Sequence, residues 1–123
     1  GMAILSDNYL VGKVVEVNYT TSRVLLLSDL NSRIPVSIEP GSIQSILFGD
    51  GKNSGFIQYI KDDALISNNS LVYTSGAGGL FKPGIPIGKI VLSKDRMDVN
   101  FFIDFTQLRY VKVESYTEEE NKQ

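Results

Sequence analysis

The stretch "ILFGDGKNSGFIQYI" (46–60) places two short apolar runs on either side of a turn made of glycine, aspartate, lysine, asparagine and serine. Both runs are rich in β-branched and aromatic residues, which favour strands. A polar connection that contains glycine is typical of the loop between two antiparallel strands. The stretch is therefore predicted to be a β-hairpin with a loose loop.

Similar short runs, separated by turn-forming residues, occupy most of the chain on both sides of this hairpin. None of them carries an apolar stripe of helical period over three turns, so almost no helix is expected. Strands are predicted over residues 9–17, 23–28, 33–38, 54–60, 71–75, 88–93, 98–105 and 109–113. Pro35 lacks a backbone N–H and places its strand at an edge or a bulge. Short strands at this spacing predict an all-β sandwich or small barrel.

Composition excludes several classes of function. The 123 residues carry a net charge of −2 and the basic residues are scattered, so the chain is not expected to bind nucleic acid. It contains no cysteine and no histidine, which excludes disulfides, cysteine nucleophiles and the commonest general base. No run of apolar residues is long enough to span a membrane as a helix.

The stretch "TSGAGGLFKPGIPIGKI" (74–90) is rich in glycine, as phosphate-binding loops are, so we compare its spacing with theirs. From Gly84 to Gly88 the spacing is one residue too short for a P-loop, and a predicted strand follows where a helix is needed. Structural turns are the better interpretation, because glycine supplies positive φ or close backbone approach and proline stiffens the exit. The predicted turn residues are Gly76, Gly78, Gly79, Pro83, Gly84, Pro86 and Gly88. No catalytic residue, metal or cofactor is predicted.

Aromatic and apolar residues in or next to loops are the remaining candidates for function. Leu80 and Phe81 lie in the middle of the glycine-rich loop, where they are either a plug of the core or an exposed anchor for a partner. The strand 98–105 is not cleanly alternating, so it is either buried on both faces or presents aromatic rings to a neighbour. The candidate partner-binding residues are Leu80, Phe81, Phe101, Phe102 and Phe105.

Two motifs resemble the core of the bacterial rod shape-determining MreC family. The first motif comprises Leu10-Val11-Gly12, Val14, Arg23-Val24, Leu26-Leu27-Ser28-Asp29, Ser32 and Pro35-Val36. The second comprises Val72, Thr74-Ser75-Gly76, Gly78-Gly79, Phe81, Gly84, Ile87-Gly88 and Ile90. The sequence keeps only one of two prolines before Gly84 and departs from the family at "NNSLVY" (68–73), where a different turn is expected.

The resemblance implies a fold made of two small β-barrels outside the cytoplasm. Residues 1–113 would form this extracytoplasmic β region, and residues 114–123 a flexible acidic tail. Within the region, residues from about 10 to 92 would form a small β-barrel of the six-stranded type. Residues 1–9 and 93–113 would form part of a second barrel. Gly1 is either native or left by removal of a tag.

The function implied by the resemblance is that of a non-enzymatic scaffold for cell-wall elongation, which maintains rod shape. The family is expected to bind a class B penicillin-binding protein, to work with MreD and MreB, and to self-associate. A single membrane helix and a coiled coil would anchor it at the periplasmic face of the inner membrane. Neither is present in this sequence, so the chain is expected to be an extracytoplasmic fragment. Two alternatives remain open: a β module that binds a small ligand or glycan, and an inactive protease-like double barrel.

An incomplete barrel leaves strand edges open. The segments expected to be unpaired are "AILS" (3–6) and "VNFFIDF" (99–105). A second copy of the chain would satisfy their backbone groups, so Phe101, Phe102 or Phe105 is expected in a contact between chains.

Overall fold

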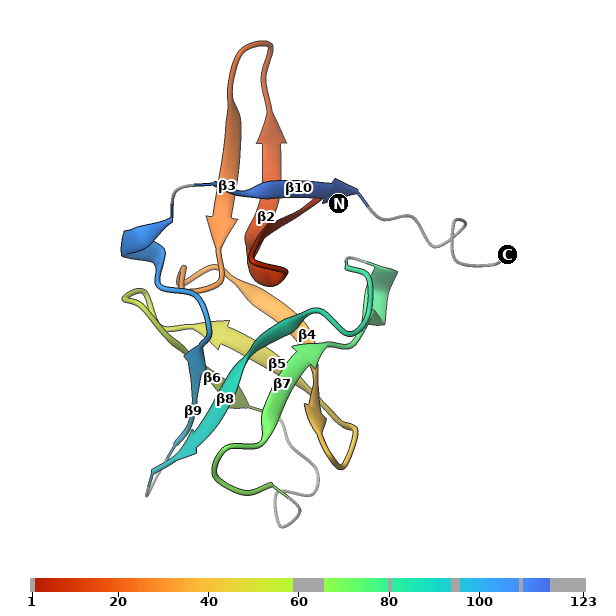
Figure 1. Ribbon diagram of the computed structural model, residues 1–123, viewed down its shortest axis with the longest axis vertical. Coiled ribbons are helices and arrows are strands. Elements are labelled where there is room, and N and C mark those ends of the chain that lie inside the picture. Colours follow the sequence, from red (N-terminus) through yellow and green to blue (C-terminus); the bar gives the residue numbers. More distant parts are fainter. Residues whose placement is uncertain (1, 59–65, 80, 94–95, 109, 116–123) are drawn as a thin grey trace, which may run out of the picture.

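The computed structural model describes residues 2–58, 66–79, 81–93, 96–108 and 110–115. In this part of the chain the structure is almost entirely β, as the sequence predicts, and the two short 3₁₀ helices are Ala77–Gly79 (η2) and Phe105–Gln107 (η3). Figure 1 shows two groups of strands: a barrel in the lower half, and a sheet at one end of it from which a long hairpin projects.

The barrel is closed and has six antiparallel strands. Their order is β4-β5-β6-β9-β8-β7. The strands are β4 (Arg33–Glu39), β5 (Ile43–Gly49), β6 (Gly55–Gln58), β7 (Leu71–Thr74), β8 (Pro86–Leu92) and β9 (Met97–Phe101). Closure leaves the barrel without a free strand edge.

The second group is a four-stranded antiparallel sheet with the order β10-β1-β2-β3. Its strands are β1 (Met2–Ser6), β2 (Tyr9–Val17), β3 (Ser22–Leu26) and β10 (Lys112–Ser115). The sheet is thus built from both ends of the described chain, and the barrel lies between β3 and β10 in the sequence.

The hairpin predicted over residues 46–60 is present as β5 and β6, with Phe48 opposite Phe56. Its loop is organised by Asp50, whose carboxylate accepts hydrogen bonds from the backbone N–H groups of Lys52 (2.7 Å) and Ser54 (3.2 Å). The hydroxyl of Ser54 donates a third bond, of 2.6 Å, to the same side chain. Aspartate suits a turn because its side chain accepts bonds from nearby backbone donors.

The predicted division of strands between the two barrels is wrong. β3 and all of β2 except Tyr9 fall within the range 10–92 but lie in the sheet, and β9 closes the barrel between β6 and β8. The local cause is the two-residue turn between β1 and β2, where Asp7 and Asn8 both have positive φ, of 52° and 68°. Such a turn matches the twist of paired strands, and it joins β2 to β1.

The predicted unpaired segments are also placed differently. β1 lies between β10 and β2, and β9 lies between β6 and β8, so both have partners on two sides. The edges of the sheet that lack a described neighbour are β3 and β10. The strand expected over 98–105 ends at Phe101, and Glu114 and Ser115 belong to β10 instead of the tail. Residues 116–123 lie outside the described residues.

Pro35 lies within the closed barrel and not at an edge. Its carbonyl accepts a hydrogen bond from the backbone N–H of Ser75 (3.2 Å), and the ladder to β7 begins only at the next residue, Val36. Because the N and O of one strand residue face the same neighbour, the missing N–H of Pro35 faces the end of that ladder. The proline therefore lacks a donor only at the end of the ladder, beyond the last pair between β4 and β7.

A single core joins the sheet to the barrel. Ala3, Leu5 and Leu10 of the sheet and Leu27 after β3 belong to the same buried cluster as the barrel residues Leu47, Ile87 and Val99, among others. The sheet therefore covers one end of the barrel and packs on it through apolar side chains, which fixes the two groups of strands relative to each other.

Candidate functional site

The glycine-rich loop has the backbone expected of structural turns. Gly76, Gly78, Gly79 and Gly84 all have positive φ, between 67° and 86°. Gly88 serves close approach instead, because a Cβ on it would lie 2.3 Å from the carbonyl oxygen of Asn100 on β9.

The side chain of Thr74 ties this loop together. Its hydroxyl donates to the carbonyl of Lys82 (2.7 Å) and accepts from the backbone N–H of Ile85 (2.9 Å), and the residue is buried. This one hydroxyl is thus the hydrogen-bond partner of both a backbone carbonyl and a backbone N–H at the base of the loop. Without it, both backbone groups would need other partners.

Phe81 is a core residue and not a partner anchor. Its side chain is 2% exposed and belongs to the same buried cluster as the barrel strands. The loop folds back so that the ring packs inside the molecule, which corrects the assignment of Phe81 to a partner-binding site. Leu80, the other candidate in this loop, lies outside the described residues.

The other three candidate phenylalanines are gathered at the end of β9. The rings of Phe101 and Phe105 meet edge to face at 5.7 Å, and the ring of Phe102 lies 5.0 Å from that of Tyr9. All three are half-buried, and Phe101 and Phe105 pack against the core. Because Tyr9 begins β2, the pair that it forms with Phe102 links the sheet to the barrel.

A hollow of about 250 Å³ lies beside these rings. We call it the β9 hollow; it is lined by Asn53, Asn100, Phe101, Phe102, Ile103, Asp104 and Phe105. Asp104 accepts hydrogen bonds from the backbone N–H (3.0 Å) and the hydroxyl (2.6 Å) of Thr106. The bond from the hydroxyl, with that from the backbone, lowers the pKa of Asp104 below its ordinary value, so the group is an anion at neutral pH.

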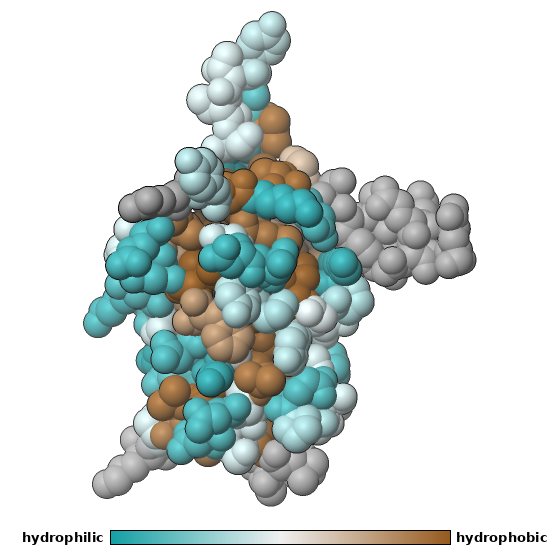
Figure 2. Space-filling model, viewed as in Figure 1, coloured by the Kyte–Doolittle hydropathy of each residue, from teal (hydrophilic) through white to brown (hydrophobic). Residues whose placement is uncertain are grey.

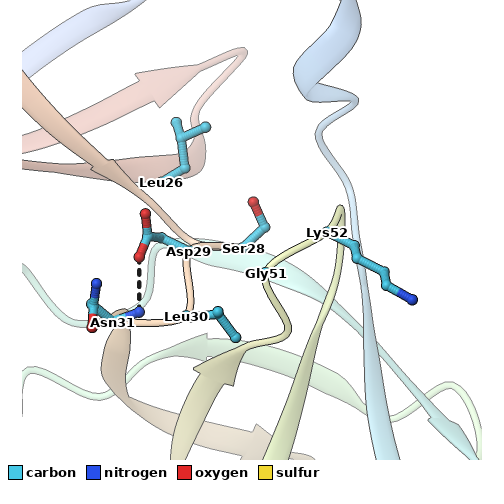
Figure 3. A pocket seen from close by; sticks show the side chains of 7 residues that line it. All are labelled: Leu26, Ser28, Asp29, Leu30, Asn31, Gly51 and Lys52. Carbon is cyan, nitrogen blue, oxygen red and sulfur yellow. Dashed lines mark hydrogen bonds between the residues drawn. The ribbon is translucent and has the colours of Figure 1, made fainter.

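A second, more open hollow of about 390 Å³ lies where β3 meets the barrel (Figure 3). It is lined by Leu26, Ser28, Asp29, Leu30, Asn31, Gly51 and Lys52. The backbone N–H of Gly51 donates to the carbonyl of Ser28 (2.7 Å), and Asp29 accepts from the backbone N–H of Asn31 (2.8 Å). The Lys52 side chain points away from Asp29 in this view. Sequence reasoning missed this hollow, although Leu26, Ser28 and Asp29 belong to the first family motif, because Gly51 and Lys52 come from the distant β5–β6 loop.

The four-stranded sheet has one charged and one uncharged face. Side chains of paired residues share a face, and residues two apart along a strand do so as well. The register places all five charged residues of these strands on the face that carries Ala3 and Leu5: Lys13, Glu16, Arg23, Lys112 and Glu114. Since Ala3 and Leu5 join the barrel core, this face is the one directed toward the barrel.

The opposite face, which we call the uncharged face, carries apolar residues, glycine, serine and one tyrosine where its side chains are described. By register it includes Met2, Ile4, Ser6, Tyr9, Gly12, Val14, Val17, Ser22, Val24, Leu26 and Val113. Val17 is 61% exposed and Val113 is 53% exposed. Figure 2 shows hydrophobic residues gathered at the base of the projecting β2–β3 hairpin. An apolar surface of this kind marks an interaction site more often than an isolated exposed residue does.

The described residues contain no group of three or more aspartate, glutamate, histidine or cysteine side chains that could hold a metal ion. Among the same residues, no helix has both the length and the apolar character that crossing a bilayer requires. The surfaces that stand out are therefore the β9 hollow, the hollow beside β3 and the uncharged face.

A closed six-stranded barrel packed on a four-stranded sheet places the chain among the all-β barrel domains. Residues 1–115 match the family described as "Rod shape-determining protein MreC, barrel core", and the chain belongs to this family. A relative from Caulobacter vibrioides, named cell shape-determining protein MreC, is 39% identical over 92% of this chain. A second relative, from Cereibacter sphaeroides, is also named cell shape-determining protein MreC. Members of the family therefore determine cell shape.

Solved structures of the family have the same fold. The structure of MreC from Pseudomonas aeruginosa aligns with a TM-score of 0.81 and 29% identity, and covers 93% of this chain and 78% of the other. A complex between penicillin-binding protein PBP2 and MreC from Helicobacter pylori aligns with a TM-score of 0.75 over 92% of this chain and 76% of the other, at 21% identity, which shows the fold alone. The chain spans about a third of the length of the curated relatives it matches, 38% of one and 33% of another.

Proposed function

We propose that this chain is the extracytoplasmic barrel region of a non-catalytic scaffold that binds a class B penicillin-binding protein during cell-wall elongation. The full-length protein would be anchored by one helix in the inner membrane, self-associate, and work with MreD and MreB. Family membership supports the role in cell shape, and the complex of the Helicobacter pylori relative with PBP2 supports the choice of partner.

The observation that carries the proposal is the separation of charge in the four-stranded sheet. All five charged residues lie on the face toward the barrel, and the uncharged face exposes Val17, Val24 and Val113. Glu16, Arg23 and Lys112 are exposed, so these charges are solvated, and the unusual feature is the exposed apolar surface without charge on the other face. A face without charge fits contact with protein, which is what a scaffold requires.

A complementation experiment tests this function. A rod-shaped bacterium without its own MreC would receive a full-length MreC whose barrel core is this chain. We expect rod shape to be restored, and binding of the purified barrel region to a class B penicillin-binding protein to be measurable by biolayer interferometry.

Substitutions that each add one positive charge then test which surface binds the synthase. Val17→Lys should weaken binding and produce rounded cells, because it places an ammonium group on the uncharged face. Val91→Lys is the matched control: Val91 is also a valine, 45% exposed, but lies on β8 of the barrel. Equal thermal stability of the two variants shows that neither is unfolded. Failure of the unaltered barrel to bind the synthase or to restore shape would refute the proposal.

A further inference from the structure

The β9 hollow contains hydrogen-bonding groups that the fold does not use. Asn53 lies in the β5–β6 loop and Asn100 in β9, and both are exposed. Neither side-chain amide forms a hydrogen bond with any residue that the structure describes. Nearby Asp50 uses both carboxylate oxygens in its turn, whereas Asp104 uses only Oδ1. The two amides therefore remain available at the rim of the hollow.

The surroundings of these amides restrict what could bind. The hollow is lined by Phe101, Phe102 and Phe105 together with polar residues, so a ligand with both apolar and polar surface suits it. Each amide offers both a donor and an acceptor, as a hydroxyl or an acetamido group requires. The carboxylate of Asp104 accepts hydroxyl donors and repels anions. An uncharged ligand with one apolar face and several hydroxyl groups satisfies all of these conditions.

We propose that the β9 hollow binds one uncharged pyranose ring of a glycan, with the amides of Asn53 and Asn100 on its hydroxyl or acetamido groups and the phenylalanine rings against its C–H face. The volume of about 250 Å³ is below that of pockets for drug-sized ligands, and suits a single ring. An apolar peptide side chain would fill the hollow but make no hydrogen bond with either amide.

This site is separate from the exposed valines of the uncharged face, although Phe102 also contacts Tyr9 at the start of β2. The β9 hollow lies on the barrel and its following turn, whereas the proposed synthase contact lies on β2, β3 and β10. Loss of one activity therefore leaves the other intact. The inference adds a direct contact with glycan to a scaffold whose proposed partner is an enzyme.

The experiment is a titration of the ¹⁵N-labelled chain with triacetylchitotriose, a soluble trimer of N-acetylglucosamine, followed by two-dimensional NMR. We expect saturable shifts confined to the backbone and side-chain amides of Asn53, Asn100 and residues 101–105, with a Kd on the order of 1 mM, as a shallow site with few hydrogen bonds allows. The double variant Asn53→Ala, Asn100→Ala should weaken binding about tenfold, since each lost bond contributes about 0.5–1.5 kcal/mol.

Asn31→Ala provides the matched control, because Asn31 is an exposed asparagine that lines the other hollow. Its affinity for the trimer should equal that of the unaltered chain. No saturable shift at trimer concentrations on the order of 10 mM, ten times the expected Kd, would overturn the proposal. Saturable shifts elsewhere, or equal affinity of the double variant, would do the same. A leucine-rich peptide that shifts the same amides while the trimer does not would identify a peptide site instead.

Discussion

Glycines of this chain fulfil two different physical requirements at the scale of single residues. At Gly88 the requirement is space, since a Cβ would lie 2.3 Å from the carbonyl oxygen of Asn100. At Gly84 the requirement is conformation, since φ is 86° and no atom lies within 4 Å of an added Cβ. The sequence pattern identified both as turn residues and could not distinguish them, because the approach of β9 to β8 depends on pairing between distant segments.

The two requirements predict different costs of substitution. Gly88→Ala should lower the free energy of unfolding by about 3 kcal/mol, because two backbones must separate. Gly84→Ala should cost about 1 kcal/mol, the strain of a left-handed residue with a Cβ. Gly41→Ala, whose Cβ would meet only the flexible side chain of Ile43 at 3.4 Å, should change it by less than about 0.5 kcal/mol. Urea unfolding measures all three, and equal costs at Gly88 and Gly41 would contradict the packing argument.

Asp50 predicts a dependence of stability on pH. Burial alone would raise the pKa of Asp50, but hydrogen bonds from Ser54 and Lys52 and the charge of Arg96 together lower it below the ordinary value of 3.8. A carboxyl whose pKa is lower in the folded state stabilises the fold above its unfolded pKa, and this contribution is lost as pH falls through the folded value.

We therefore expect Asp50→Ala to lower the free energy of unfolding by about 1–2 kcal/mol at neutral pH, through loss of the bonds that order the β5–β6 loop. The difference from the unaltered chain should shrink as pH falls below about 4, where the carboxyl becomes protonated. Urea unfolding at a series of pH values checks this. Ser54→Ala should reproduce part of the effect, and a difference that grows toward low pH would contradict it.

At the scale of elements, the glycine-rich loop depends on one hydroxyl group. Thr74→Val keeps the shape of the side chain but leaves the N–H of Ile85 and the carbonyl of Lys82 without their bonds. It should lower the free energy of unfolding by about 1–3 kcal/mol, the cost of buried groups without partners. Hydrogen exchange should become faster at the amide of Ile85.

Thr74→Ser is the matched control, since it removes a methyl group and retains the hydroxyl. It should preserve the slow exchange of Ile85 and cost less than Thr74→Val. If valine and serine give the same exchange rate, the hydroxyl does not hold the loop.

Comparison of the predicted and observed strands shows which parts of the fold follow from local sequence. β2 spans residues 9–17 as predicted, and β5 and β6 form the predicted hairpin, because strand propensity and turn chemistry act over a few residues. The assignment of β9 to the barrel and of β3 to the sheet was not predicted, because register between segments far apart is set by packing of the complete core. For the same reason the sequence could propose Phe101, Phe102 and Phe105 as partner-binding residues, which stays a prediction, but could not identify the hollow beside them, because it depends on Asn53 from another loop.

At the scale of the whole molecule, the uncharged face and the open edges β3 and β10 predict self-association of the isolated chain. Apolar surface and unpaired strand edges both favour contact with a second copy. In sedimentation velocity we expect the average mass to rise with concentration, and Val113→Lys to suppress that rise. Val91→Lys on the barrel should have no such effect, and a monomer at every concentration would contradict the prediction.

The sheet pairs Met2 with Ser115, so its first strand is synthesised long before its last. While the ribosome is still producing β4 to β9, β1 can pair with β2 but its other edge remains open to solvent. The barrel, by contrast, is a contiguous segment from Arg33 to Phe101, and all its strands can meet before β10 leaves the ribosome. Folding during translation should therefore finish at the sheet, and a chain released before residue 112 would carry a complete barrel with an exposed β1 edge, the kind of edge that promotes aggregation.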